Sequence, residues 1–514
     1  MNPVRKWWIF ACLIFATLMF GFSAQADGHT TVTFGLESPK SLDPATNSND
    51  PEILFQRTIY DFLLEASVDE TGGTVFTPNL ATDWQISEDG LTYTFELREG
   101  VLFHDGSTFS SADVVHTFER LVEMGSPANA LLGDFSVEAD GAQRVVFTLA
   151  NPNADFLFGV SSRWSLIIRD GNANPGVVAE DGDDPYQNFN GTGAFILSEY
   201  IPEVSASFIA NENYWQEGSP GIENLVFQFI NDATTRVNAL QNGEIDAIFK
   251  LSIQQLRELE VHENVKTYVV ATNQHPVIRL RSDAGFAGEN PLVRQAFKLA
   301  TDRELLNDDL MSGVGTVGNN DPIGPVYGSF YHPLAASYDY DPERSCALLA
   351  EAGYEEGYSG TLYVVDAFNY SDLGVALQEQ WAQACIDVEI LVRPQNIYYG
   401  NNEWMEVELG ITGWGSNPVA QQYLVQAYVT DGVWNESRWS NAEVDALIAE
   451  ASVTSDIANR ATIYSRISEL FAEDAPIIVP WFAPMIGATT ARVEGFNLAA
   501  FAGLTDLRTL SIAN

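Results

Sequence analysis

Apolar and polar side chains alternate along residues 91–97, and this period of two predicts a β-strand with one buried face. Residues 101–103 predict a short second strand, and the His-Asp-Gly-Ser sequence at 104–107 predicts a turn. Ser110 or Ser111 suits the N-cap of a following helix, because apolar residues recur there at helical spacing.

The same periodicities predict elements along the rest of the chain. Strands are expected at residues 31–36, 145–149, 361–365, 388–392 and 409–414. Helices are expected at 53–64, 342–353, 373–384, 441–451 and 459–473. Because one helix lies between the strands at 361–365 and 388–392, we expect a strand–helix–strand unit there. The mixture predicts an α/β fold, and 514 residues are enough for two or three domains.

The first residues are typical of a secretory signal. Arg5 and Lys6 precede an apolar run at residues 9–22, and the Ala-Gln-Ala sequence at 24–26 is a cleavage site that leaves Asp27 as the mature start. The apolar run is shorter than the roughly 20 residues that span a bilayer. We therefore expect residues 1–26 to be a signal peptide and the product to be a soluble, exported protein, with no membrane span after cleavage.

The chain is strongly acidic, with 25 basic and 70 acidic residues and a formal net charge of −45. Removing Arg5 and Lys6 with the signal leaves 23 basic residues and a net charge of −47. Nucleic acids and anionic membrane surfaces attract basic proteins, so neither is an expected partner. A solvated acidic surface without a specific partner is the favoured explanation, and a saline habitat is the alternative.

Two cysteines, Cys346 and Cys385, remain after signal cleavage. An exported pair permits one disulfide. The alternative is two buried free thiols, because each cysteine falls in a predicted helix.

Motifs that suggest catalysis or cofactor binding lack the context that they need. The glycines at 313–318 fit G-x-G-x-x-G, but they follow a helix instead of a strand. His104 and Asp105 resemble a metal pair, yet the other histidines show no ligand spacing, and a turn explains both residues. We therefore expect no metal, no cofactor and no catalytic residues.

The stretch LATDWQISEDGLTYTFELREGVLFHDGSTFSSADVVHTFERL, residues 80–121, resembles a long motif of family 5 of the bacterial solute-binding proteins, the dipeptide- and oligopeptide-binding proteins of ABC importers. Further segments at 190–197, 211–215, 232–246 and 290–297 are similar to other motifs of this family. The last two imply helices at 232–242 and 290–303. The resemblance covers essentially the whole mature chain.

The resemblance implies a two-lobed periplasmic binding protein with a hinge and with ligand held between the lobes. Lobe I is expected at residues 27–62, 187–270 and 480–514, an inserted subdomain at 63–186, and lobe II at 271–479. It also implies a monomeric receptor that delivers a small solute, by default a peptide, to the permease of an ABC importer. The alternatives are an oligosaccharide or other non-peptide solute on the same scaffold and, less favoured, an exported hydrolase.

Candidate ligand contacts are aromatic and amide side chains at expected strand ends and in loops, together with a loop near the family's ligand cleft. They are Glu37, Ser38, Phe368, Asn369, Trp414, Ser416, Asn417, Gln421 and Trp439. Relatives that bind dipeptides are similar in using an aspartate after the strand at 409–414, and some use an arginine after the strand at 361–365. This chain has neither. The sequence therefore favours a neutral, hydroxylated or amide-bearing ligand, unless Glu37, Asp366 or Arg393 supplies the missing charge.

Overall fold

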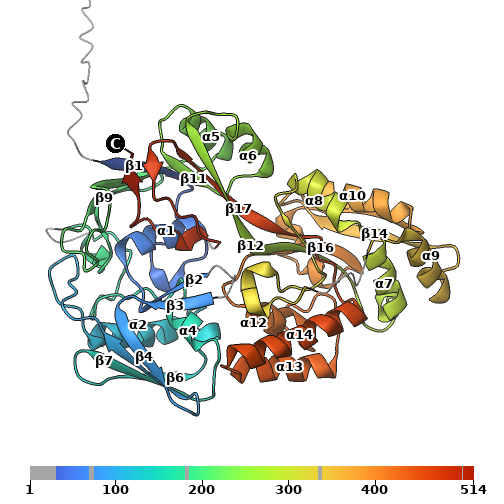
Figure 1. The fold of residues 1–514 in the computed structure, drawn as a ribbon, viewed down its shortest axis with the longest axis horizontal. Coiled ribbons are helices and arrows are strands. Elements are labelled where there is room, and N and C mark those ends of the chain that lie inside the picture. Colours follow the sequence, from blue (N-terminus) through green and yellow to red (C-terminus); the bar gives the residue numbers. More distant parts are fainter. Residues whose placement is uncertain (1–29, 69–73, 180–183, 334–338, 501, 514) are drawn as a thin grey trace, which may run out of the picture.

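The computed structural model describes residues 30–68, 74–179, 184–333, 339–500 and 502–513. These residues form a two-lobed α/β fold, as predicted (Figure 1). In this part of the chain one eleven-stranded sheet extends through both lobes in the order β15-β14-β16-β12-β17-β11-β1-β10-β9-β8, with β13 paired to β17. The expected signal peptide, residues 1–26, lies outside the described residues.

The first lobe is built on β1 (Thr31–Leu36), which is parallel to β10 and places Phe34 opposite Phe227. Its other elements are α1 (Asp50–Ile59), β8 (Phe195–Ile201), β9 (Ser205–Ala210), β10 (Asn224–Phe229), α5 (Ala233–Gln241), β11 (Ala247–Phe249), α6 (Ile253–Leu259), β18 (Val493–Glu494) and β19 (Ser511–Ile512). The predicted helix at 53–64 is wrong in its limits. A capping box between Asn49 and Glu52 starts α1 earlier, and the chain is already extended at Tyr60.

A smaller unit with its own core packs beside the first lobe. It contains the hairpin of β2 (Leu64–Val68) and β3 (Thr74–Pro78), a four-stranded sheet of β4 (Ala81–Ile86), β5 (Thr92–Leu97), β7 (Arg144–Leu149) and β6 (Phe135–Ala139), and the helices α2 (Ser111–Glu123), α3 (Asn129–Leu132) and α4 (Phe156–Val160). Tyr93, Phe95 and Leu97 of β5 are buried, which confirms the one-sided strand. We call residues 64–168 the small-sheet unit.

Two details of this unit test the sequence interpretation. Ser110 is the N-cap of α2, as predicted, and the Asp113 carboxylate at the third helical position accepts from the backbone N–H and the hydroxyl of Ser110. The predicted strand at 101–103 is wrong: the described chain has there only one bridge, between Leu102 and Thr108. Around the turn that follows, the N–H of Phe103 donates to the carbonyl of Ser107, and the N–H of Phe109 donates to the carbonyl of Val101.

The second lobe contains the predicted strand–helix–strand unit. β14 (Tyr358–Val365) and β15 (Ile386–Arg393) are parallel, α10 (Tyr370–Ala382) connects them, and β16 (Leu409–Trp414) lies on the other side of β14. The remaining elements are α7 (Pro291–Leu299), α8 (Arg303–Met311), β13 (Thr316–Val317), α9 (Pro342–Glu351), α11 (Gln395–Tyr398), α12 (Ala420–Tyr423), α13 (Ala442–Val453) and α14 (Ile457–Asp474). The expected helix at 290–303 is wrong, because Asp302 caps a new helix by accepting from the N–H of Leu305.

Two long strands cross between the lobes. β12 (Val265–Leu280) pairs with β17 (Trp481–Thr490) along its first part and with β16 from His275 onward. Its register shifts between Val270 and Gln274, where the ladder is interrupted. Figure 1 shows β12 and β17 side by side at the junction of the lobes. Motion of one lobe against the other has to be absorbed by these strands.

Cys346 and Cys385 form a disulfide with a Cα–Cα distance of 5.2 Å, so the free-thiol alternative is wrong. Cys346 lies in α9, but Cys385 follows α10 with φ of 62°. α10 ends at Ala382, so Cys385 lies in the turn after the helix, which corrects its expected helical position. Within the described residues no helix is long and apolar enough to cross a membrane.

Candidate ligand-binding cleft

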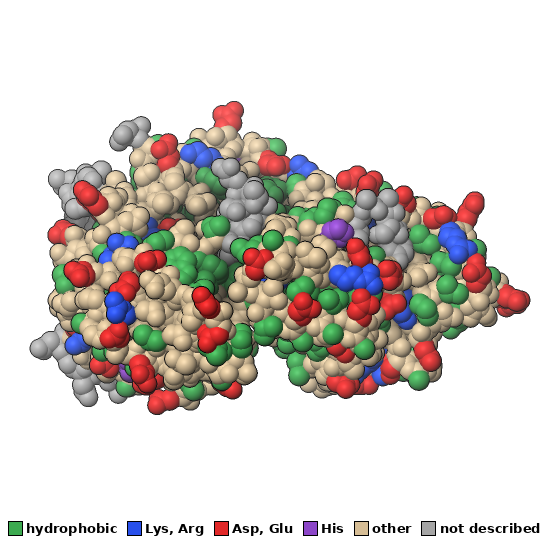
Figure 2. Space-filling model, turned by 60° about the horizontal axis from the view of Figure 1, so that its bottom comes forward, with side chains coloured by type: hydrophobic (Ala, Val, Ile, Leu, Met, Phe, Trp, Pro, Cys, Tyr) green, Lys and Arg blue, Asp and Glu red, His purple; other side chains and the backbone are tan. Residues whose placement is uncertain are grey.

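A cleft of about 910 Å³ lies where the first lobe, the small-sheet unit and the second lobe meet. Its lining includes Ser48, Asn49, Asp50, Arg57 and Lys250 from the first lobe, Glu65, Phe158, Ser161, Arg163 and Trp164 from the small-sheet unit, Gln274, Ser416, Asn417 and Gln422 from the second lobe, and Asp506 and Arg508 near the C-terminus. Figure 2 shows the surface hollowed between the two halves of the molecule. The volume suits a small organic solute.

The first-lobe wall is held rigid around the start of α1. The Glu52 carboxylate accepts hydrogen bonds from backbone N–H groups of Ser41 at 3.0 Å and Ser48 at 2.6 Å, which fixes the loop before the helix. Beside it, the Lys250 ammonium lies 2.6 Å from the Asp50 carboxylate. The wall therefore presents an ion pair and the polar cap of a helix.

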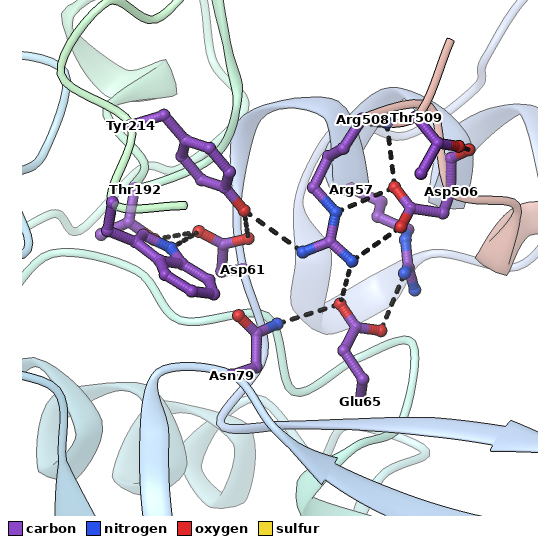
Figure 3. Close-up of polar contacts among 10 residues, drawn as sticks. Arg57, Asp61, Glu65, Asn79, Thr192, Tyr214, Asp506, Arg508 and Thr509 are labelled. Carbon is purple, nitrogen blue, oxygen red and sulfur yellow. Dashed lines mark hydrogen bonds and ion pairs between the residues drawn. The ribbon is translucent and has the colours of Figure 1, made fainter. Parts of the chain in front are cut away.

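A network of charges forms another part of the lining, at the right of Figure 3. Glu65 accepts hydrogen bonds from Arg57 at 2.8 Å and from Arg508 at 3.0 Å, and Arg508 also donates to both carboxylate oxygens of Asp506 at 2.8 Å. Asn79 donates to Glu65 at 2.9 Å. Each of these charges has an opposite partner, so the network gives the cleft a fixed polar surface.

Beside this network, to its left in Figure 3, lies the buried residue Asp61. Its carboxylate accepts hydrogen bonds from Thr192 at 3.0 Å and from Tyr214 and Trp215 at 3.1 Å each. Burial raises the pKa of Asp61, and the nearby Arg508 guanidinium opposes that rise. Asp61 therefore anchors the segment 192–215 to the loop after α1, behind the cleft surface.

The second-lobe wall is the loop after β16. The Ser416 hydroxyl accepts from the N–H of Asn273 at 3.0 Å, and Tyr327 donates to the carbonyl of Asn417 at 2.6 Å. Tyr423 supports the same loop, since its hydroxyl donates to the Gly415 carbonyl at 2.6 Å. These bonds hold residues 415–417 in one conformation against the cleft.

Of the nine candidate ligand contacts, Ser416 and Asn417 line the cleft and the other seven do not. Gln421 donates from its amide to the carbonyl of Ile448 and so joins α12 to α13. Trp439 is a core residue that donates to Asp474. These contacts give both side chains a structural role, and their contact with ligand stays a prediction.

The remaining five lie near strand ends but outside the lining. Glu37 is ion-paired with Arg236, and Ser38 donates its N–H to Asn231. Phe368 and Asn369 have positive φ values in the exposed turn before α10, and Trp414 packs against Tyr423 and Trp434. Their contact with ligand stays a prediction.

The cations of the cleft were missed by the sequence interpretation. They are Arg57, Arg163, Lys250 and Arg508. They come from positions as much as 451 residues apart, and no spacing in the sequence connects them. Asp366 and Arg393, considered above as substitute charges, do not line the cleft.

The residues that suggested metal and nucleotide chemistry have structural roles. His104 is partly buried with its Nε2 3.0 Å from the Gly193 carbonyl, and desolvation lowers its pKa to about 4. The glycines at 313–318 surround β13 after α8 and do not begin a helix. In the described part of the chain no group of three histidine, cysteine or acidic side chains is arranged to hold a metal ion.

A two-lobed α/β fold with a solute-sized cleft between its lobes defines the class of extracellular binding proteins. The family model for bacterial extracellular solute-binding proteins, family 5, middle region, matches residues 75–436. The chain belongs to this family, which consists of solute-binding proteins.

Several relatives are similar over nearly the full chain. Heme-binding protein A of Haemophilus influenzae is 28% identical over 472 residues, covering 86% of this chain and 85% of that protein. The dipeptide-binding protein of Pseudomonas aeruginosa is 27% identical over 533 residues, covering 97% of both. The solved structure of HbpA2 from Haemophilus parasuis has a TM-score of 0.81 at 26% identity, over 94% of this chain and all of that chain.

Proposed function

We propose that this chain is the exported receptor of an ABC importer and that it captures short peptides between its lobes. The interlobe cleft carries this proposal, because its amide and hydroxyl groups stand beside paired charges and can bind both the backbone and the ends of a peptide. Relatives named for dipeptides and for di- and tripeptides support the same ligand class.

The remaining expectations complete the proposal. The signal peptide directs the chain to the periplasm, and the mature protein acts as a monomer that presents its closed form to a permease. The lobes follow the limits given above, with the inserted subdomain at 63–186. Closure depends on ligand binding the closed form more tightly than the open form. The protein performs no catalysis.

A binding screen tests this function. Protein purified without refolding is mixed with di- and tripeptides and, separately, with an oligosaccharide panel, and bound masses are read by native mass spectrometry. A peptide at 100 times its dissociation constant is expected to add about 2.7 kcal/mol to the free energy of unfolding. It is also expected to reduce the scattering radius. Binding of oligosaccharides alone, or release of cleaved peptide, would contradict the proposal.

A further inference from the structure

The charges that line the cleft do not cancel. Four basic residues, Arg57, Arg163, Lys250 and Arg508, face three acidic ones, Asp50, Glu65 and Asp506, which leaves one excess positive charge. This is unusual in a chain with a net charge of −45. All three acidic residues are ion-paired with three of the four cations, as described above. The excess charge is that of Arg163.

Arg163 is the cation of the lining without a protein partner. Among the residues that the structure describes, its guanidinium takes part in no hydrogen bond and no ion pair. The guanidinium carbon lies over the ring of Trp164, 4.4 Å from the ring centroid. Burial lowers the pKa of Arg163, which the carboxylates of Asp50 and Glu52 partly offset. Asp50 is already paired with Lys250, and Glu52 with backbone N–H groups. Arg163 is partly buried, and a partly desolvated cation without an ionic partner is destabilising unless a ligand supplies the anion.

A second polar group on the same wall lacks a partner. Ser161 lines the cleft and is 4% exposed, and its hydroxyl has no hydrogen-bond partner in the described part of the chain. The neighbouring Ser162 differs, because its hydroxyl bonds to Ser165 at 2.9 Å. A hydroxyl donor two residues before an unpaired guanidinium can satisfy an anion with several acceptor oxygens.

We propose that Arg163 and Ser161 form the binding site for a carboxylate of the solute. A guanidinium matches a carboxylate with two parallel N–H donors, and the Ser161 hydroxyl can donate to the same group. The site lies on the small-sheet unit, away from the loop after β14, where the family resemblance implies an arginine in some relatives. The inference rests on the proposed function and narrows it, since it requires the solute to carry a free acid.

The test uses matched acids and amides. One mixture of di- and tripeptides is offered as free acids and the same mixture as C-terminal amides, and a third arm contains succinate, glutarate and citrate. The proteins are the wild type, Arg163→Gln, Ser161→Ala and the control Arg169→Gln. Arg169 pairs with Asp105 and does not line the cleft. Binding is read by native mass spectrometry, and hits are measured by calorimetry.

We expect free acids to bind the wild type about 10- to 100-fold more tightly than their amides, the range for hydrogen bonds to charged groups. Arg163→Gln is expected to abolish that preference, Ser161→Ala to reduce it, and Arg169→Gln to leave it unchanged. The ligand-free melting temperature of Arg163→Gln is expected to equal or exceed that of the wild type, because no protein ion pair is lost.

The outcomes separate this inference from the proposed function. Equal binding of acids and amides would contradict the carboxylate site but would agree with the proposed peptide-receptor function. If only the small carboxylates bind, and Arg163→Gln abolishes that binding, the carboxylate site is supported and the proposal of a peptide ligand is contradicted. If no acid in either arm binds, or if acids bind Arg163→Gln as tightly as the wild type, the inference is overturned.

Discussion

Arg460 of α14 donates two hydrogen bonds to the carboxylate of Asp155, at 2.7 and 2.8 Å, although 305 residues separate them in the sequence. Both side chains are largely buried. Asp155 precedes α4 in the small-sheet unit, whereas Arg460 belongs to the second lobe. The N–H of Ala154 donates to the carbonyl of Ser452 at the same contact. These bonds tie together two parts that any hinge motion must move relative to each other.

The pair is therefore expected to control how far the lobes separate. Arg460→Gln leaves the Asp155 carboxylate without its partner, and opening of the lobes lets water reach it. We expect the lobe equilibrium to shift toward open forms by about 2 kcal/mol, roughly 30-fold. The measurement is the scattering radius of the ligand-free protein, which should increase, together with a weaker apparent affinity for any verified ligand.

A control for this variant lies on the same helix. Arg466 forms exposed ion pairs with Glu443 and Glu469, both within the second lobe. Exposed pairs contribute little, so Arg466→Gln should leave the radius and the affinity unchanged. If both variants gave the same radius as the wild type, the lobes would not be held by Arg460 and Asp155.

The ion pair also shows what the sequence could predict and what it could not. Periodicity predicted β1, β16 and the strand–helix–strand unit, because the spacing of apolar residues within each element indicates which of its faces is buried. The cleft is different. Arg163 and Arg508 line the cleft from segments that meet only because the two lobes pack together. Local sequence patterns do not predict which distant segments meet. Ser416 and Asn417 were found because a short loop after a strand end is itself a local feature.

The disulfide allows a prediction about stability alone. It closes a loop of 39 residues between α9 and the end of α10, and the chain-entropy model gives about 4 kcal/mol for a loop of that length. Urea unfolding of the Cys346→Ala/Cys385→Ala double variant should show a loss of that order. Ligand affinity should not change, because neither cysteine lines the cleft. Two titratable thiols in the unreduced wild type would contradict the bond.

The acidic surface predicts that salt stabilises the fold. Figure 2 shows acidic side chains distributed over both halves of the face drawn, and a net charge of −45 causes self-repulsion in the compact state. The Debye length falls from about 10 Å at 0.1 M salt to about 3 Å at 1 M. The melting temperature should therefore rise over that range, by roughly 2–4 °C for each kcal/mol gained in a domain of 150–250 residues. An uncharged osmolyte at equal osmolality provides the control, and a flat salt response would refute the explanation.

The buried carboxyl group of Asp321 is expected to make the folded state less stable as the pH rises toward neutral. Asp321 is buried against α14, where its carboxyl group bonds to the Ser468 hydroxyl and accepts from the N–H of Ile323 at 2.6 Å. Burial raises its pKa to about 6, although those two hydrogen bonds and the Lys298 charge act against the rise. The folded state therefore prefers the protonated acid more than the unfolded chain does.

The sign of the effect follows from this preference. Stability from Asp321 is fully present below the ordinary aspartate pKa of about 4, and it declines until the pH passes about 6, by about 3 kcal/mol in all. Asp321→Asn imitates the protonated acid, because its amide oxygen can accept from Ile323 and its NH₂ can donate to Ser468. We expect the variant to lose this dependence between pH 4 and 6 and to equal or exceed the wild type above pH 7. Asp387→Asn, at an exposed site on β15, is the control, and urea unfolding across this pH range is the measurement. A wild-type slope of the opposite sign that Asp321→Asn removes would show that Asp321 is folded as the charged form.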